Sequence, residues 1–192
     1  MSGYPTPIEW KSAAWWRNRS LDERLFHLNI PKRIHAALPD WDSKFAVEWL
    51  PESNLLINGS SGTGKSLMAA GHIVNVLKHH PVSGKWVEAD DYIDMLKDSF
   101  DNDGLLPEMY SSPHLVKYIK GVFDVIVIDG LGEERLTEFA SHELGSLIRK
   151  RFDQNRSTII TSRLSLQDIK NRYGTRLANP LAEFQTQVTR AR

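Results

Sequence analysis

The chain has 192 residues, and 41% of them are hydrophobic. It contains no cysteine, and its 24 acidic residues balance 24 basic ones. This length allows one domain with a substantial core, and the lack of cysteine excludes disulfides and thiolate metal sites. No apolar run is long enough to cross a membrane, and the first residues lack the basic start and apolar stretch of a secretory signal. We therefore expect a cytoplasmic protein with no membrane partner.

The charge is unevenly distributed along the chain. Residues 88–143 contain fourteen acidic and four basic residues, a balance of −10, whereas residues 145–192 contain ten basic and three acidic residues, a balance of +7. These segments could form two solvated surfaces, two sides through which protomers assemble head to tail, or a basic end that binds nucleic acid. A net charge of zero argues against a protein that coats DNA through a general positive charge.

Tryptophans crowd the N-terminal arm, at Trp10, Trp15 and Trp16, beside Arg17 and Arg19. Large aromatic side chains seldom remain in water. We therefore expect this arm to pack on its own domain. Contact with a protein partner is the main alternative, and stacking of nucleic-acid bases on Trp15 or Trp16 is a third.

Short helices are predicted between this arm and the first strand. Ser20 and Glu23 form the capping-box pattern at the start of one helix, and Pro31 begins a second that ends before Pro39. A third short helix is predicted over residues 44–50. These helices could cover a bound base.

A glycine-rich stretch, residues 59–66, organises the rest of the chain. It fits the phosphate-binding pattern G-x-x-x-x-G-K-[ST], between a predicted strand over residues 54–58 and a predicted helix over residues 66–80. Glycines let backbone N–H groups converge on phosphates, and the helix start adds its positive end. The expected nucleotide-binding residues are Gly59, Ser60, Ser61, Gly62, Thr63, Gly64, Lys65, Ser66 and Leu67.

Two further predictions concern the phosphates and a metal ion. Lys65 can reach the β and γ phosphates of ATP, and the Ser66 hydroxyl can hold Mg²⁺. Asp129 ends the apolar run of residues 124–129, the clearest predicted strand, and an acid at the carboxyl edge of a parallel sheet can reach the same Mg²⁺. This is the Walker B role.

Strands and helices alternate after the phosphate-binding loop. Strands are predicted over residues 85–88, 124–129 and 157–162, with an edge strand over 184–188, and helices from Asp90 or Asp91 to Phe100 and over 114–120, 136–152 and 165–173. This order predicts an α/β fold of three layers, a mainly parallel sheet with helices on both faces and no separate lid domain. We expect residues 1–50 to form an arm continuous with a core over residues 51–192.

The order of motifs resembles the AAA+ ATPases of the DnaC and IstB type, the helicase loaders and transposition helpers. The resemblance covers about Ile30 to Glu183 and is carried by Ile30-Pro31, the loop 59–66, Trp86-Val87, residues 128–132, and the two strings 161–165 and 172–178. It implies a P-loop AAA+ core that binds ATP and Mg²⁺, assembles head to tail, and acts with DNA or a replicative helicase, in a protein of a phage or mobile element.

The sequence departs from this family at three positions that serve hydrolysis. Gly130 stands where the family has a second acid after the Walker B aspartate, Arg163 where it has a sensor asparagine, and Pro180 where it has an arginine that reaches the neighbour's γ-phosphate. An arginine finger alone is worth about 10³ to 10⁵ in rate. We therefore expect ATP binding with slow hydrolysis.

Other residues could restore part of this chemistry. Glu133 or Glu134 could replace the missing acid, and Arg163 or Arg176 could act as the finger. Our expected catalytic residues are accordingly Lys65, Asp129, Glu133, Arg163 and Arg176.

Three functional hypotheses follow. The first is a DNA-associated assembly ATPase, for which Lys117, Lys120 and Arg135 are possible phosphate contacts. The second is an adaptor that binds ATP only for stability and recruits a protein through the tryptophan arm. The third is a small-molecule kinase, against which no arginine-rich lid or acceptor motif is visible.

Overall fold

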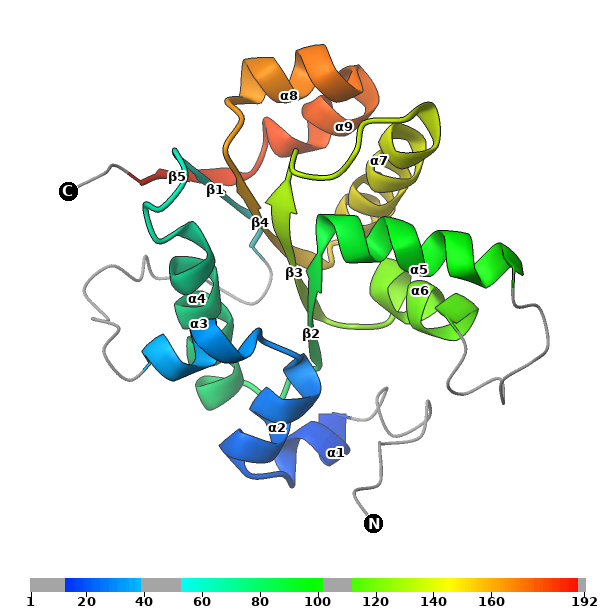
Figure 1. The fold of residues 1–192 in the computed structure, drawn as a ribbon. Coiled ribbons are helices and arrows are strands. Elements are labelled where there is room, and N and C mark those ends of the chain that lie inside the picture. The colour runs from blue at the N-terminus through cyan, green and yellow to red at the C-terminus, as the bar shows by residue number, and fades with distance from the viewer. Residues whose placement is uncertain (1–12, 39–52, 102–111, 190–192) are drawn as a thin grey trace.

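The computed structural model describes residues 13–38, 53–101 and 112–189. Five parallel strands form one sheet in the order β2-β3-β4-β1-β5, as Figure 1 shows. The strands are β1 (Leu55–Asn58), β2 (Gly84–Glu88), β3 (Val125–Leu131), β4 (Ser157–Ser162) and β5 (Gln185–Val188). The predicted parallel α/β fold is confirmed.

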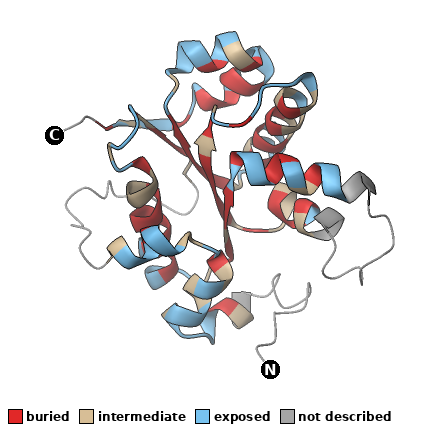
Figure 2. Ribbon diagram, in the orientation of Figure 1, coloured by how far each residue is buried: buried red, intermediate tan, exposed pale blue. Residues whose placement is uncertain are grey.

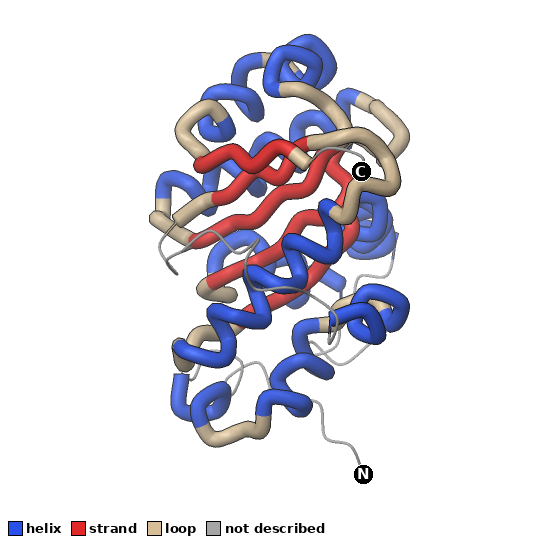
Figure 3. Tube along the Cα trace, turned by 90° about the vertical axis from the view of Figure 1, so that its left-hand side faces the viewer, coloured by secondary structure: helices blue, strands red, loops and turns tan. Residues whose placement is uncertain are grey.

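Helices cover both faces of the sheet (Figures 1 and 3). One side carries α4 (Lys65–His79), joined by α2 (Leu21–Leu28) and α3 (Lys32–Ala37), and α1 (Ala13–Arg17) precedes them. The other side carries α5 (Ala89–Asp101), α6 (Ser112–Gly121) and α7 (Glu138–Asp153), with α8 (Leu166–Tyr173) and α9 (Thr175–Leu181) packed against α7. No helix among the described residues is long and apolar enough to span a membrane.

Local sequence signals fix several helix ends. Ser20 caps α2 in a complete capping box, in which the Glu23 N–H donates to Ser20 Oγ (3.2 Å) and the Ser20 N–H donates to Glu23 Oε2 (2.9 Å). Ser165 caps α8 in the same way with Asp168. The predicted cap at Asp90 or Asp91 is wrong by two or three residues, because α5 begins at Ala89 and both acids lie in its first turn.

Two helices were not predicted, and two sequence predictions lie outside the described residues. α1 and α9 have five and seven residues, too few for a readable period, and α9 contains Pro180. The predicted helix over residues 44–50 and Trp10 lie outside the described part of the chain.

The sheet is the centre of the hydrophobic core (Figure 2). Every residue of β4 is buried, as are the first five of β3, which explains why both read as continuous apolar or small-residue runs. Trp16 is completely buried in this core, and Trp15 packs against it with the Arg19 guanidinium 5.1 Å from the Trp15 ring centre. The two tryptophans therefore pack on their own domain, as expected.

A buried arginine ties the sheet to the helices at the end away from the phosphate-binding loop. Arg151 of α7 is fully buried and donates to the carbonyls of Ile119, Phe123, Asp124 and Ser157 and to Thr158 Oγ1, at 2.8–3.2 Å. Burial lowers the pKa of this guanidinium to about 9. These bonds compensate the charge for lost hydration and fix the start of β3 and β4 against α6 and α7.

Candidate nucleotide site

The glycine-rich loop lies between β1 and α4, at the carboxyl edge of the sheet. Its first residue is tied to the sheet, because the Gly59 N–H donates to the Ser162 carbonyl of β4 (3.2 Å). α4 begins at Lys65, so the free N–H groups of its first turn face the loop. The predicted strand, turn and helix are all present.

The C-terminal strand supports this loop from behind. Thr189, just after β5, donates its N–H to the Asn58 carbonyl (2.7 Å), and its hydroxyl lies 2.6 Å from that of Thr63. A Cβ on Gly59 would lie 2.2 Å from Thr189 Oγ1, so only glycine permits this approach. The first glycine of the motif is therefore required by packing as well as by phosphate binding.

The Lys65 side chain lies within the loop. Its Nζ donates to the Ser60 carbonyl (2.7 Å), and the residue is buried. Burial lowers the pKa of Lys65, against the opposing effect of the Glu133 and Asp129 carboxylates. A phosphate group would therefore meet a partly desolvated ammonium, for which the electrostatic attraction is stronger than in water.

Asp129 forms the acidic side of the site. Its Oδ1 accepts from Ser66 Oγ (2.8 Å) and from Thr161 Oγ1 (2.5 Å), which joins the ends of β3, α4 and β4. Thr161 Oγ1 also accepts from the Gly130 N–H (2.9 Å). One hydroxyl and one carboxylate within hydrogen-bond distance are oxygen ligands of the kind that Mg²⁺ prefers, so the donor set fits the predicted ion.

A cavity of about 710 Å³ opens over these groups. From the loop and α4 it is lined by Ser61, Gly62, Gly64, Lys65, Ser66 and Leu67, and from the ends of β2, β3 and β4 by Glu88, Ala89, Asp90, Asp129, Gly130, Glu133 and Thr161. Arg33, Ile34 and Ala37 of α3 complete it. The cavity thus extends from the phosphate-binding loop to the β2 edge of the sheet.

Glu133 lies beside the position of the missing acid. Gly130 has a φ of 76°, its pairing with β4 is irregular, and the Glu133 N–H donates to the Gly130 carbonyl (2.9 Å) in a tight turn. A Cβ on Gly130 would lie 3.5 Å from the Glu133 carboxyl group. The turn therefore returns a carboxylate to the place from which a side chain at position 130 would project.

Glu134 has a different environment. It is 2% exposed, its Oε2 accepts from the Gly132 N–H (2.9 Å), and its Oε1 accepts from the Tyr173 hydroxyl. Arg172 donates to the Glu134 carbonyl (2.8 Å) and pairs with its carboxylate (3.6 Å). This carboxylate binds the 130–134 loop to α8 and does not line the cavity.

The predicted arginines occupy different places. Arg163 pairs with Glu133 (Nε–Oε1, 3.0 Å) at the exposed rim of the site. Arg176 is exposed on α9, where its Cγ lies 3.8 Å from the position of a Cβ on Gly145, and it does not line the cavity. Its role toward a neighbouring protomer stays a prediction.

The three predicted DNA contacts lie on α6 and in the segment before α7. Lys120 forms an ion pair with Glu143 (2.8 Å) on the α6–α7 side, whereas Lys117 and Arg135 are exposed. Their contact with DNA stays a prediction.

Sequence reasoning missed four residues at the site. Thr161 has a readable signal, since it lies near the end of a buried strand adjacent to that of Asp129. Glu88 likewise ends β2. Arg33 and Thr189 carry no such signal, because only the packing of α3 and β5 brings them to the loop.

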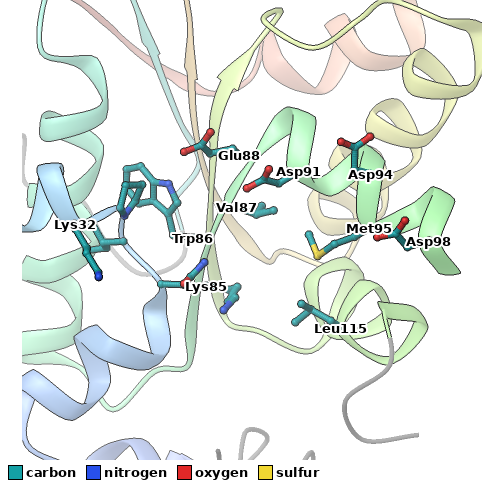
Figure 4. A pocket seen from close by; sticks show the side chains of 13 residues that line it. Lys32, Lys85, Trp86, Val87, Glu88, Asp91, Asp94, Met95, Asp98 and Leu115 are labelled. Carbon is teal, nitrogen blue, oxygen red and sulfur yellow. The ribbon is translucent and has the colours of Figure 1, made fainter. Parts of the chain in front are cut away.

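A second cavity has a volume of about 510 Å³, and Figure 4 shows the side chains that line it. Glu88 lines both cavities, and the second is also lined by Lys32, Lys85 and the acidic face of α5, with Asp91, Asp94 and Asp98. Burial lowers the pKa of Lys85 to about 8.

Together, the parallel sheet, the glycine-rich loop after β1 and the acid near the end of β3 define a P-loop nucleotide-binding protein of the AAA+ type. The profile of the IstB-like ATP binding protein family matches residues 36–181. The chain belongs to this family.

Solved structures support the same fold. The DnaI structure superposes with a TM-score of 0.67 at 21% identity, covering 85% of this chain and 96% of that one. The DnaC helicase loader gives 0.63 at 22% identity, covering 83% and 87%. The replication initiator DnaA bound to AMPPCP and single-stranded DNA gives 0.61 at 15% identity, covering 84% and 45%. A comparison with curated protein sequences gives no match.

Proposed function

We propose that this protein binds ATP and Mg²⁺, assembles head to tail on DNA or on a replicative helicase, and acts as a helicase-loader-like factor with slow hydrolysis. The observation that carries the proposal is the convergence of Lys65, Ser66 and Asp129 at one end of the loop cavity. The family match supports nucleotide binding, and the similarity to DnaC and DnaI structures supports the loader-like role.

In this proposal the loop binds ATP through its backbone and two of its side chains. The backbone N–H groups of residues 60–66 surround the outer phosphates, and Lys65 exchanges its bond to the Ser60 carbonyl for phosphate oxygens. Ser66 and Asp129 would hold Mg²⁺, which supplies charge neutralisation of the β and γ phosphates when bound. Thr161 keeps the Asp129 carboxylate in place.

Hydrolysis is proposed to depend on Glu133. Its carboxylate borders the cavity and lies beside Gly130, so it can orient a water and accept its proton. In this structure, however, Arg163 pairs with that carboxylate, and Pro180 is buried inside α9, where it cannot serve a neighbouring site. A base that is already paired and the lack of the usual finger both favour slow turnover.

A second candidate function is that of a transposition helper, because the matching family is described as IstB-like. The nucleotide chemistry would be the same, and the two functions would differ in the protein partner. The adaptor hypothesis is weakened, since Trp15 and Trp16 are packed within this domain.

Nucleotide binding and assembly can be tested together. Lys65→Ala should weaken ATP binding by about tenfold to a hundredfold, from the loss of one charged hydrogen bond, whereas Lys78→Ala, at the far end of the same helix, should leave it unchanged. Particle size should increase with ATP but not with ADP, and binding of a DNA oligonucleotide should fall as salt rises. A Lys65→Ala protein with normal ATP affinity would refute the proposal.

A further inference from the structure

Two adjacent basic residues on α3 face two different cavities. Arg33 lines the nucleotide cavity, together with Ile34 and Ala37. Lys32 lines the neighbouring cavity, where its side chain stands apart from the aspartates of α5 (Figure 4). Of these two positive charges, only that of Arg33 lines the cavity of the phosphate-binding loop.

Packing holds α3 at this place. Ile34 is 6% exposed and belongs to the hydrophobic core, and α3 contacts α4, the helix that begins at Lys65. Pro31 starts the helix and accepts from the N–H groups of Ile34 (2.9 Å) and His35 (3.0 Å). The backbone of Arg33 is thus held beside the cavity, and its side chain is exposed.

Arg33 has no stable partner among the described residues, with which it forms neither a hydrogen bond nor an ion pair. The other cation of the cavity lining, Lys65, is bonded to Ser60, and Arg163 at the rim is paired with Glu133. Arg33 interacts only at longer range with Glu88, whose pKa is raised by burial and by nearby acids and lowered by Arg33. A guanidinium that forms no hydrogen bond or ion pair with the described residues, at an acidic cavity wall, is suited to an anionic ligand.

The strand order indicates which part of the ligand is within reach. The loop follows β1, whereas Asp129 belongs to β3 and Glu88, next to Arg33, ends β2, the last strand on that side. A triphosphate that enters at the loop directs its outer phosphates toward the Asp129 carboxylate. Arg33 therefore approaches from beyond Asp129, on the side of the terminal phosphate.

We propose that Arg33 binds the terminal phosphate of ATP from within the same chain and thereby determines the preference for ATP over ADP. The inference rests on the proposed function. Arg33 would supply the positive charge at the terminal phosphate that an arginine at position 180 of a neighbouring protomer would otherwise supply. Position 180 is a proline here, and Arg163 is paired with Glu133.

The test compares two ligands on the parent protein and three variants. Calorimetry with β,γ-methylene-ATP and with ADP should show that Arg33→Ala weakens the triphosphate analogue by about tenfold, from the loss of one charged hydrogen bond, with less than about a twofold change for ADP. Arg33→Lys should restore part of the analogue affinity, because it keeps the charge but not the planar fork. Lys32→Ala, the adjacent control, should bind both ligands normally.

The outcomes separate this inference from the proposed function. Equal changes for both ligands in Arg33→Ala, or no change for either, would overturn the role of Arg33. Normal nucleotide binding by Lys65→Ala would instead overturn the site itself. Arg33 and Lys32 are exposed, so the melting temperatures of the Arg33 and Lys32 variants without nucleotide should match that of the parent protein.

Discussion

Changing Glu133 to glutamine should reduce hydrolysis with little loss of stability, whereas the same change at Glu134 should reduce stability with little loss of hydrolysis. Glu133 is about half exposed, and its single described ion pair is with the equally exposed Arg163. Exposed pairs contribute at most about 1 kcal/mol. We therefore expect Glu133→Gln to leave the free energy of unfolding within about 1 kcal/mol of the parent value.

Glu134→Gln should cost far more stability. Its buried carboxylate accepts from the Gly132 N–H and the Tyr173 hydroxyl and pairs with Arg172. An amide keeps one acceptor oxygen, so its NH₂ group must face at least one of these donors. An unsatisfied buried donor costs about 1–3 kcal/mol, and loss of a partner in a buried pair costs more. We expect a loss of about 2–4 kcal/mol.

The rate of hydrolysis should fall more in Glu133→Gln than in Glu134→Gln. If Glu133 orients and deprotonates the attacking water, Glu133→Gln should lower the single-turnover rate by about 10² or more, with unchanged ATP affinity. Glu134→Gln should retain most of the rate at a temperature where it is folded, because the turn from Gly130 to Glu133 is closed by backbone atoms.

Urea denaturation and single-turnover hydrolysis measure the two properties on the same preparations. A Glu134→Gln protein as stable as the parent but inactive, or a Glu133→Gln protein with full hydrolysis, would refute the division of roles.

Three further predictions concern the scaffold. Arg151→Met should lower the free energy of unfolding by about 3–5 kcal/mol in urea, since it leaves four carbonyls and the Thr158 hydroxyl without this donor; a loss below about 1 kcal/mol would contradict this. Thr189→Val should weaken ATP binding several-fold, with recovery in Thr189→Ser, because its hydroxyl meets that of Thr63 in the loop; equal affinities by calorimetry would exclude this support. Burial lowers the pKa of Lys85 to about 8, so between pH 8 and about 10.5 the unfolded chain binds more protons than the folded one. As the pH rises through this range, the free energy of unfolding of the parent should increase by up to about 3 kcal/mol relative to that of Lys85→Met. A constant difference between the two proteins in urea denaturation across this range would show that Lys85 does not titrate there.

Much of the nucleotide site could be predicted because its signals are local. The glycine pattern needs only the backbone freedom of a few residues, and the apolar strand that ends in Asp129 is readable from the chain itself. The contact between Ser66 and Asp129 then follows from the edge that parallel strands share.

The choice between Glu133 and Glu134 could not be predicted. Adjacent residues of the same type have the same local signal, and the difference arises from contacts with α8, about forty positions later in the chain. The sequence likewise does not show that the turn after Gly130 brings the Glu133 carboxylate next to position 130.

The sequence by itself determined the α/β class, the loop and its acid, and the departures from the family at positions 130, 163 and 180, because each is carried by residue types at fixed spacing. The tertiary structure decided that Glu134 is structural, that Thr189 supports the loop, and that Arg33 and Lys32 face different cavities. The physical reason is that charge and hydrogen-bonding partners separated along the chain are brought together only by the packing of whole elements, on which local patterns carry no information.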